Sequence, residues 1–140
     1  MDLSGLDFVI LDWNGTVVPF FGQPIYPGAQ SLLNELRAEG IRLVVVSHAY
    51  QAEIERDVKR TGLEVDEVHG CVNKSPIVLE ISQRLGCGIL LGDHPMDCRS
   101  ALAAGIPFFQ AAFEGQGRLK ESTGFFQTWE ELQVFLPGSS

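Results

Sequence analysis

The feature that most constrains the fold of this chain is a series of short apolar runs separated by stretches with helical spacing. The runs lie at residues 8–11, 41–46, 65–69, 89–91 and 106–109. A short apolar run bounded by turn residues is typical of a strand buried on both faces, as in a parallel sheet. Alternation of such strands with helices requires helices on both faces of that sheet. We therefore expect an α/β fold, a three-layer α/β/α sandwich around a mostly parallel central sheet of about five strands.

The segments between these runs are expected to be helices that end at glycine. Apolar spacing places them at 28–40, 50–61, 74–85 and 96–104, and a capping-box pattern at Thr128 and Glu131 predicts a last helix through Leu136. Apolar pairs on either side of Gly22 and Pro24 indicate a short hairpin-like flap within 13–27, and 114–124 is expected to be a loop. Residues 1–140 then form one domain, with a tail at 138–140.

Composition excludes several classes of function. The net charge is −8, and no basic cluster is longer than Lys59-Arg60, which argues against nucleic acid as the partner. No apolar run approaches the length of a membrane span, and the first residues lack the pattern of a secretory leader, so a cytoplasmic location is expected. The three cysteines form no CxxC pair, which indicates neither a disulfide framework nor a zinc site.

Polar residues follow the predicted strands at their carboxyl ends. Asp12 follows the first strand, Ser47 the second, Lys74 comes just past the third, and Asp93 follows the fourth. Right-handed crossovers bring these ends to one edge of the sheet, where open α/β sheets bind their ligands. Taken singly, Asp93 is better explained as a helix N-cap and Lys74 as a solvated residue at a helix start. Together they are the residue types that phosphate and metal chemistry requires.

In order along the chain, these residues resemble the motifs of the haloacid dehalogenase (HAD) superfamily of phosphotransferases and hydrolases. Asp12-Trp13-Asn14-Gly15-Thr16 is similar to its first motif, DxDGT, and Ser47 and Lys74 to the second and third. Gly92-Asp93-His94-Pro95-Met96-Asp97, with Ala103-Ala104-Gly105-Ile106-Pro107 after it, is similar to the fourth, GDxxxD. The resemblance covers essentially the whole chain and implies the Rossmann-like HAD fold.

The resemblance also implies roles for individual residues. Asp12 would attack phosphorus and form an aspartyl-phosphate, while Lys74 would neutralise charge. Phosphate oxygens would be bound by Lys74, by the Ser47 hydroxyl and by backbone N–H groups of Gly15 and Thr16. His48 and His94 lie beside motif residues, either within reach of a substrate or as exposed bystanders, and we count His48 among the phosphate-binding candidates.

A magnesium ion is the cofactor that the resemblance implies. Its expected ligands are Asp12, Asp93 and the backbone carbonyl of Asn14, with Asp97 orienting the water shell of the ion. Mg²⁺ prefers a few carboxylates together with water, which fits this set.

The sequence departs from the family pattern at Asn14, where most HAD phosphatases carry an aspartate that acts as general acid and base. An amide cannot exchange a proton at neutral pH. Relatives that lack this aspartate include dehalogenases, which need no metal, phosphonoacetaldehyde hydrolases, which use a cap-domain lysine, and P-type ATPases, which form a long-lived aspartyl-phosphate.

The chain also leaves no room for a cap domain. About 34 residues separate Asp12 from Ser47 and about 26 separate Ser47 from Lys74, too few for an inserted domain. Capless relatives tend to act on large phosphorylated substrates or to close the site with a second subunit, so a homo-oligomer is open. Phe20, Phe21 and Tyr26 of the flap would then shape the entrance.

The sequence thus predicts a capless, Mg²⁺-dependent HAD-type phosphohydrolase. Because of Asn14, its turnover is expected to be slow or its substrate range narrow. The alternative is a catalytically weakened HAD-like module that binds a phosphorylated ligand or a protein partner. A receiver-like signalling domain is disfavoured, because it would carry serine or threonine after the fourth strand.

Overall fold

The computed structural model describes residues 5–132, and within them the chain folds around one six-stranded sheet. The strand order is β3-β2-β1-β4-β5-β6, and every neighbouring pair is parallel. The strands are β1 (Phe8–Leu11), β2 (Arg42–Ser47), β3 (Glu67–Gly70), β4 (Gly88–Gly92), β5 (Phe108–Ala111) and β6 (Gly124–Phe126). The α/β class is confirmed, and the sheet is parallel throughout rather than mostly parallel.

The sequence did not predict the sixth strand, β6. The expected loop at 114–124 includes its first residue, Gly124, and no strand was expected after it. β6 has only three residues, too short for a periodic signal, and pairs with β5 through Gln110 and Phe125. Glycine at its first position allows the ring of Phe109 to lie against the backbone, where a Cβ atom would collide with it. Strand β6 therefore exists because of packing against β5 and not because of its own sequence pattern.

The predicted helices are present with bounds close to those expected. They are α1 (Ala29–Ala38), α2 (Gln51–Thr61), α3 (Lys74–Leu85), α4 (Pro95–Ala104) and α5 (Trp129–Leu132). The predicted end of the last helix at Leu136 and the tail at 138–140 lie outside the described residues. Among the helices within 5–132, none has the length and apolar character needed to cross a bilayer.

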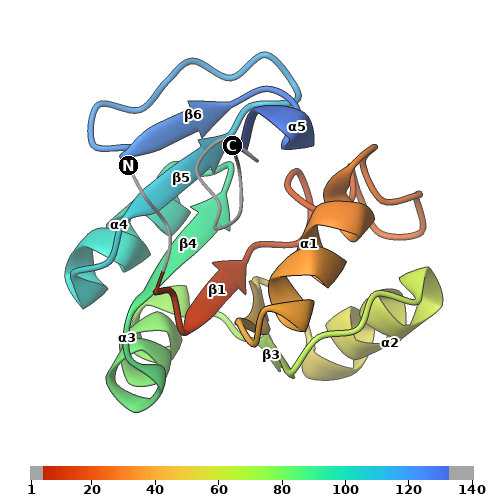
Figure 1. Ribbon diagram of the computed structural model, residues 1–140, viewed down its shortest axis with the longest axis horizontal. Coiled ribbons are helices and arrows are strands. Elements are labelled where there is room, and N and C mark those ends of the chain that lie inside the picture. Colours follow the sequence, from red (N-terminus) through yellow and green to blue (C-terminus); the bar gives the residue numbers. More distant parts are fainter. Residues whose placement is uncertain (1–4, 133–140) are drawn as a thin grey trace.

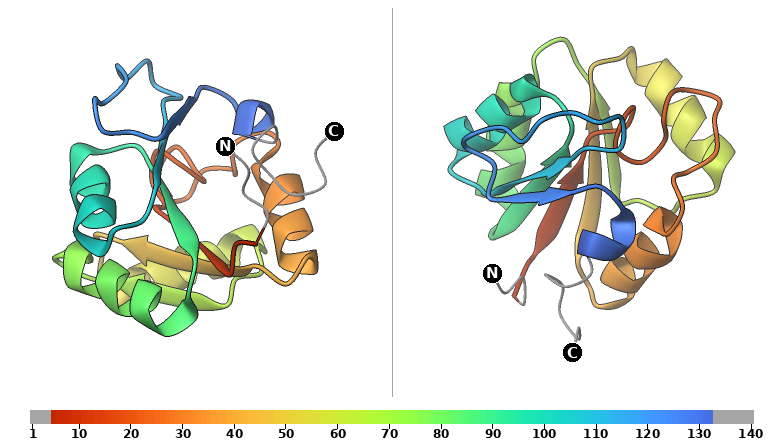
Figure 2. Two further views of the ribbon diagram at one scale, coloured as in Figure 1. Left: turned by 60° about the vertical axis from the view of Figure 1, so that its left-hand side comes forward. Right: turned by 90° about the horizontal axis from the view of Figure 1, so that it is seen from above.

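The helices cover both faces of the sheet (Figures 1 and 2). Helices α1, α2 and α5 pack over one face, onto side chains such as Leu11 and Val45, and α3 and α4 pack over the other, onto Ile10 and Val46. Alternate residues of one strand thus enter different cores, as the twofold repeat of a strand requires. Within residues 5–132 no inserted domain interrupts this arrangement, so the predicted absence of a cap is confirmed.

The flap after β1 is not a hairpin, and that detail of the prediction is wrong. Among the described residues, 13–27 contain turns and one isolated bridge between Asn14 and Val18. Val17 and Val18 are both fully buried, so the two do not alternate as strand residues would. Of the aromatic residues expected at the entrance, Phe20 is exposed while Phe21 and Tyr26 are partly buried against the core.

The flap is tied to α2 by the buried carboxylate of Asp57. This side chain accepts hydrogen bonds from Trp13 Nε1 at 2.7 Å and from the Gly22 amide at 3.0 Å. It also forms an ion pair with Arg60 at 2.8 Å. Burial favours the neutral acid, but the bonds from Arg60, Trp13 and Gly22 outweigh it and lower the pKa of Asp57. Asp57 therefore fixes the loop that begins at the predicted nucleophile, Asp12.

We predict that Asp57→Ala lowers the free energy of unfolding by about 3 kcal/mol at neutral pH, because it leaves the Trp13 and Gly22 donors and Arg60 without their partner. Since the pKa of Asp57 is lowered on folding, its contribution is present above about pH 4, where aspartate ionises in the unfolded chain, and is lost as pH falls below it. Urea unfolding at several pH values measures this, with exposed Glu53→Gln as the control on the same helix. A difference from wild type that does not shrink in acid would contradict the assignment.

Candidate active site

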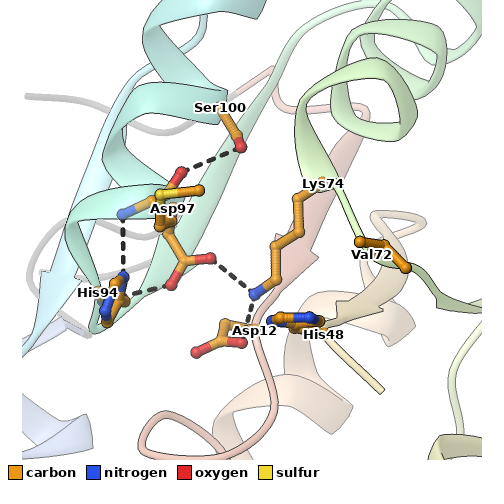
Figure 3. Close-up of a pocket in the computed structure, with 8 residues that line it drawn as sticks. Asp12, His48, Val72, Lys74, His94, Asp97 and Ser100 are labelled. Carbon is orange, nitrogen blue, oxygen red and sulfur yellow. Dashed lines mark hydrogen bonds and ion pairs between the residues drawn. The ribbon is translucent and has the colours of Figure 1, made fainter. Parts of the chain in front are cut away.

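The centre of the site is the ammonium group of Lys74, held between two carboxylates. Lys74 Nζ lies 2.6 Å from Asp12 Oδ1 and 2.7 Å from Asp97 Oδ1. Its side chain is only 12% exposed, so the alternative of a solvated residue at a helix start is wrong. Figure 3 shows the ammonium between the two carboxyl groups, which come from β1 and α4. Three separate elements therefore meet at this charge.

The start of α3 places Lys74. Asn73 is the N-cap, and its side chain accepts a hydrogen bond from the Ser75 amide at 3.1 Å. Pro76 follows in the first turn, where its missing N–H costs nothing. Lys74 is the first residue of the helix, so its side chain extends from the edge of the sheet toward the end of β1.

A capping box fixes the start of α4, and the residue that caps this helix is not Asp93. The N-cap is His94: its Nδ1 accepts from the Met96 amide at 3.0 Å, and Asp97 accepts from the His94 amide at 3.3 Å. Asp93 is thus not the helix cap, and its carboxylate is available to the site. Asp97 has a double role, because the same side chain caps the helix and pairs with Lys74.

Three carboxylates gather here in a way that suits a hard cation. Asp12, Asp93 and Asp97 each offer an oxygen within 4.8 Å of the other two. The Oδ1 atom of Asn14 is buried and has no hydrogen-bond partner among the described residues. Gly15 has a φ of 82°, and a Cβ atom there would collide with the Asp93 carboxylate, so only glycine lets the loop approach it. This all-oxygen donor set fits Mg²⁺.

The carboxylates carry more negative charge than Lys74 neutralises. Burial raises the pKa of Asp12 to about 6, against the opposing effect of Lys74. Burial and the charge of Asp12 raise the pKa of Asp97 to about 6, and burial raises that of Asp93. Burial alone would lower the pKa of Lys74, but the charges of Asp12 and Asp97 raise it, so the lysine stays protonated. A divalent cation would relieve the excess negative charge.

The residues predicted to bind phosphate are placed differently from one another. The amides of Gly15 and Thr16 donate within their own turn, to Val18 at 2.7 Å and Trp13 at 3.2 Å. Within 5–132, no acceptor pairs with the amides of Trp13 and Asn14, which leaves these two available in the same loop. The Thr16 hydroxyl lies 3.3 Å from Asp12 Oδ2 and donates to it, so its contact is with the predicted nucleophile.

Of the two phosphate-binding candidates at the end of β2, Ser47 and His48, only His48 lines the cavity. Ser47 is buried, and its carbonyl accepts from the amides of Ala49 and Cys71 at 3.0 Å each. It is not among the described residues that line the cavity, whereas the exposed side chain of His48 is.

The cavity at this edge of the sheet has a volume of about 390 Å³. It is lined by Asp12, His48, Val72, Lys74, His94, Met96, Asp97 and Ser100 (Figure 3). Sequence reasoning missed Val72, Met96 and Ser100, because nothing in their own pattern separates them from ordinary surface or helix residues. It also missed Gln116, whose Nε2 lies 3.4 Å from Asp93 Oδ2 across a long sequence separation.

Comparison with known protein families matches residues 21–111 to the family of haloacid dehalogenase-like hydrolases. The chain belongs to this family. The match begins after Asp12, so it does not cover this residue, and the nucleophile role of Asp12 stays a prediction. A comparison with curated proteins gives no match.

Solved structures share the fold of this HAD-family chain. A haloacid dehalogenase-like hydrolase from Streptococcus pneumoniae is 14% identical, with 93% of this chain and 98% of that one covered and a TM-score of 0.77. The 3-deoxy-D-manno-octulosonate 8-phosphate phosphatase of Moraxella catarrhalis was solved with magnesium, phosphate and KDO. It is 16% identical, the alignment covers 93% of this chain and 85% of that one, and the TM-score is 0.70. A D,D-heptose 1.7-bisphosphate phosphatase from B. bronchiseptica was solved in complex with magnesium and phosphate. It is 19% identical, the alignment covers 91% of this chain and 98% of that one, and the TM-score is 0.69.

We predict that Mg²⁺ stabilises the protein at about pH 7 and much less at about pH 5, because the raised pKa values of Asp12 and Asp97 make protons compete with the ion. In the metal-free protein the folded state holds these extra protons between about pH 4 and pH 6, so this contribution to stability falls as pH rises across that range. At about 100 times its Kd, Mg²⁺ should add about 2.7 kcal/mol to the free energy of unfolding.

Thermal unfolding with and without MgCl₂ at both pH values measures this effect. Asp93→Asn should remove most of it, while Glu39→Gln, an exposed residue after α1, should not. A stabilisation of equal size at both pH values, or in Asp93→Asn, would place the ion elsewhere.

Proposed function

We propose that this protein is a Mg²⁺-dependent phosphohydrolase that cleaves phosphate monoesters through an aspartyl-phosphate on Asp12. The observation that carries the proposal is the ammonium of Lys74, fixed between Asp12 and Asp97 beside a third carboxylate in an open cavity. Membership of the hydrolase family supports the reaction class. The magnesium and phosphate in two of the structural neighbours support the cofactor and the phosphorylated substrate.

In the first step an Asp12 oxygen attacks phosphorus, and the bond from phosphorus to the ester oxygen breaks. Lys74, which pairs with Asp12, and the amides of Trp13 and Asn14, which have no acceptor among the described residues, would bind the phosphate oxygens. Phosphoryl transfer depends mainly on positioning and on neutralising charge, which these groups provide. Bound Mg²⁺ would add positive charge at the same phosphate, held by Asp12, Asp93 and the carbonyl of Asn14, with Asp97 behind them.

In the second step water cleaves the aspartyl-phosphate and regenerates Asp12. Asn14 follows the nucleophile by two residues and cannot take a proton from that water. General acid–base catalysis contributes about 10²–10⁴-fold in enzymes. We therefore propose an enzyme with slow turnover or a narrow substrate range. The capless cavity is open to large phosphorylated substrates or to closure by a second copy of the chain, and we propose the cytoplasm as its location.

Asn14 also favours a second candidate function, a module that binds a phosphorylated ligand or a protein partner without turnover. Its buried Oδ1 atom has no partner among the described residues and is free to accept a hydrogen bond or bind an ion. Such a module would retain the binding chemistry of Lys74 and the carboxylates and lose the proton transfer.

The phosphohydrolase proposal is tested by phosphate release from p-nitrophenyl phosphate with and without Mg²⁺. We expect slow Mg²⁺-dependent turnover in wild type and a loss of at least about 10³-fold in Asp12→Asn, because the amide is not a nucleophile. Glu39→Gln is the matched control at the opposite edge of the sheet. Equal turnover in wild type and Asp12→Asn, or none in wild type at high enzyme concentration, would overturn the proposal.

Asn14→Asp separates the enzyme from the binding module. If the site is a weakened enzyme, restoring a carboxyl group there should raise kcat on alkyl phosphates by about 10²-fold, since these leaving groups need a proton. Asn14→Ala gives the comparison without hydrogen-bonding capacity. A module whose site cannot align the reaction should show tight binding of phosphate in a filtration assay and no gain in turnover.

A further inference from the structure

We propose that the substrates of this site are phosphate monoesters of aromatic alcohols, whose oxygen leaves without receiving a proton. The inference rests on the proposed function and names its substrate class. It depends on two features of the cavity, the groups that are able to donate a proton there and the apolar character of its walls.

Among the described residues that line the cavity, no carboxyl group is free to protonate a leaving group. Of its two lining carboxylates, Asp12 is the nucleophile, and Asp97 is held by Lys74 and by the His94 amide. The Lys74 ammonium is shared between the two carboxylates. Ser100 bonds to the Met96 carbonyl and the Ser75 hydroxyl, both at 3.0 Å. The position that supplies the acid in most relatives is Asn14.

A site without a free carboxylic acid selects for the leaving group. An aromatic alcohol ionises near pH 10, as tyrosine does, whereas an alkyl alcohol is a far stronger base. In the first step the Asp12 oxygen forms a bond to phosphorus and the ester P–O bond breaks. Its electron pair stays on the leaving oxygen, which departs as an aryl oxide and is protonated by solvent. Water then attacks the aspartyl-phosphate, releasing inorganic phosphate and the Asp12 carboxylate.

The walls around the nucleophile fit an aromatic body. Val72 and Met96 line the cavity and expose 88% and 51% of their surfaces, so both apolar side chains are accessible to a ligand there. Figure 3 shows Val72 on one side of the Lys74 ammonium and His94 on the other, and His48 lines the same cavity. Flat imidazoles pack against aromatic rings. Among the described lining residues Lys74 alone is a permanent cation, which suits one phosphate and an otherwise apolar substrate.

The experiment compares kcat/KM for p-nitrophenyl, phenyl and benzyl phosphate with the Mg²⁺-loaded wild-type protein. Benzyl phosphate is the matched control, because it keeps the aromatic ring but leaves as an alkyl alcohol. kcat/KM reports the cleavage of the ester bond even where hydrolysis of the aspartyl-phosphate limits kcat. We expect benzyl phosphate to be at least about 100-fold poorer than phenyl phosphate, and Asn14→Asp to narrow that gap.

The apolar wall is tested separately. Met96→Ser and Val72→Ser should each raise KM for phenyl phosphate by on the order of tenfold, and leave inhibition by inorganic phosphate unchanged. Leu102→Ser is the matched control, since Leu102 is 55% exposed on the same helix as Met96 and does not line the cavity. An unchanged KM in both wall variants would overturn this half of the inference.

Each failure is distinguishable. Similar kcat/KM for phenyl and benzyl phosphate would overturn the inference, while the proposed phosphohydrolase function would stand. In that case, a lower kcat/KM for benzyl phosphate alone in His48→Gln would show that His48 supplies the proton. No Asp12-dependent release from any ester would overturn both. A phosphotyrosine peptide compared with free phenyl phosphate then assigns the source: a higher kcat/KM for the peptide indicates protein substrates, and a lower one small aryl phosphates.

Discussion

The ion pairs of Lys74 with Asp12 and Asp97 hold together the three elements that make this site. Burial raises the pKa of both carboxyl groups to about 6, and the charge of Asp12 raises that of Asp97 further. The Lys74 ammonium, 2.6 and 2.7 Å from the two carboxylates, opposes these shifts, and the charges of the carboxylates keep it protonated. The end of β1, α3 and α4 are thereby fixed at one point, and Asp12, the predicted nucleophile, is held in place.

This arrangement depends on how the chain ends its strands and starts its helices. Parallel pairing of β1 with β2 and β4 brings the ends of these strands to one edge of the sheet. The caps at Asn73 and His94 then set where α3 and α4 begin, within a turn of the residues that reach the site. Asp57 holds the flap through Trp13, next to Asp12. Structural hydrogen bonds and site geometry therefore share the same residues.

Sequence reasoning performed best where chemistry and pattern coincided. The first five strands, the four long helices and the meeting of Asp12, Lys74, Asp93 and Asp97 followed from apolar runs, glycine stops and polar strand ends. It failed for the hairpin, since Val17 and Val18 look like strand residues but are core residues, and for β6, since three residues carry no period. The sequence also predicted that the Gly15 and Thr16 amides bind phosphate, but in the structure these amides donate hydrogen bonds within their own turn.

The sequence by itself determined the fold class and the reactive groups, because burial periodicity and residue chemistry are local properties. It also determined the main departure from the family pattern, the amide of Asn14. Only the tertiary structure decided which groups have partners: that Thr16 donates to Asp12, that His94 rather than Asp93 caps α4, and that Val72 and Met96 line the cavity. The cavity and the Lys74 ion pairs join segments distant in the chain, and the distances there depend on how β1, α3 and α4 pack, which no local pattern encodes. The bonds of Thr16 and His94 are short in sequence, but the backbone geometry of the loop and of the helix start decides which donor meets which acceptor.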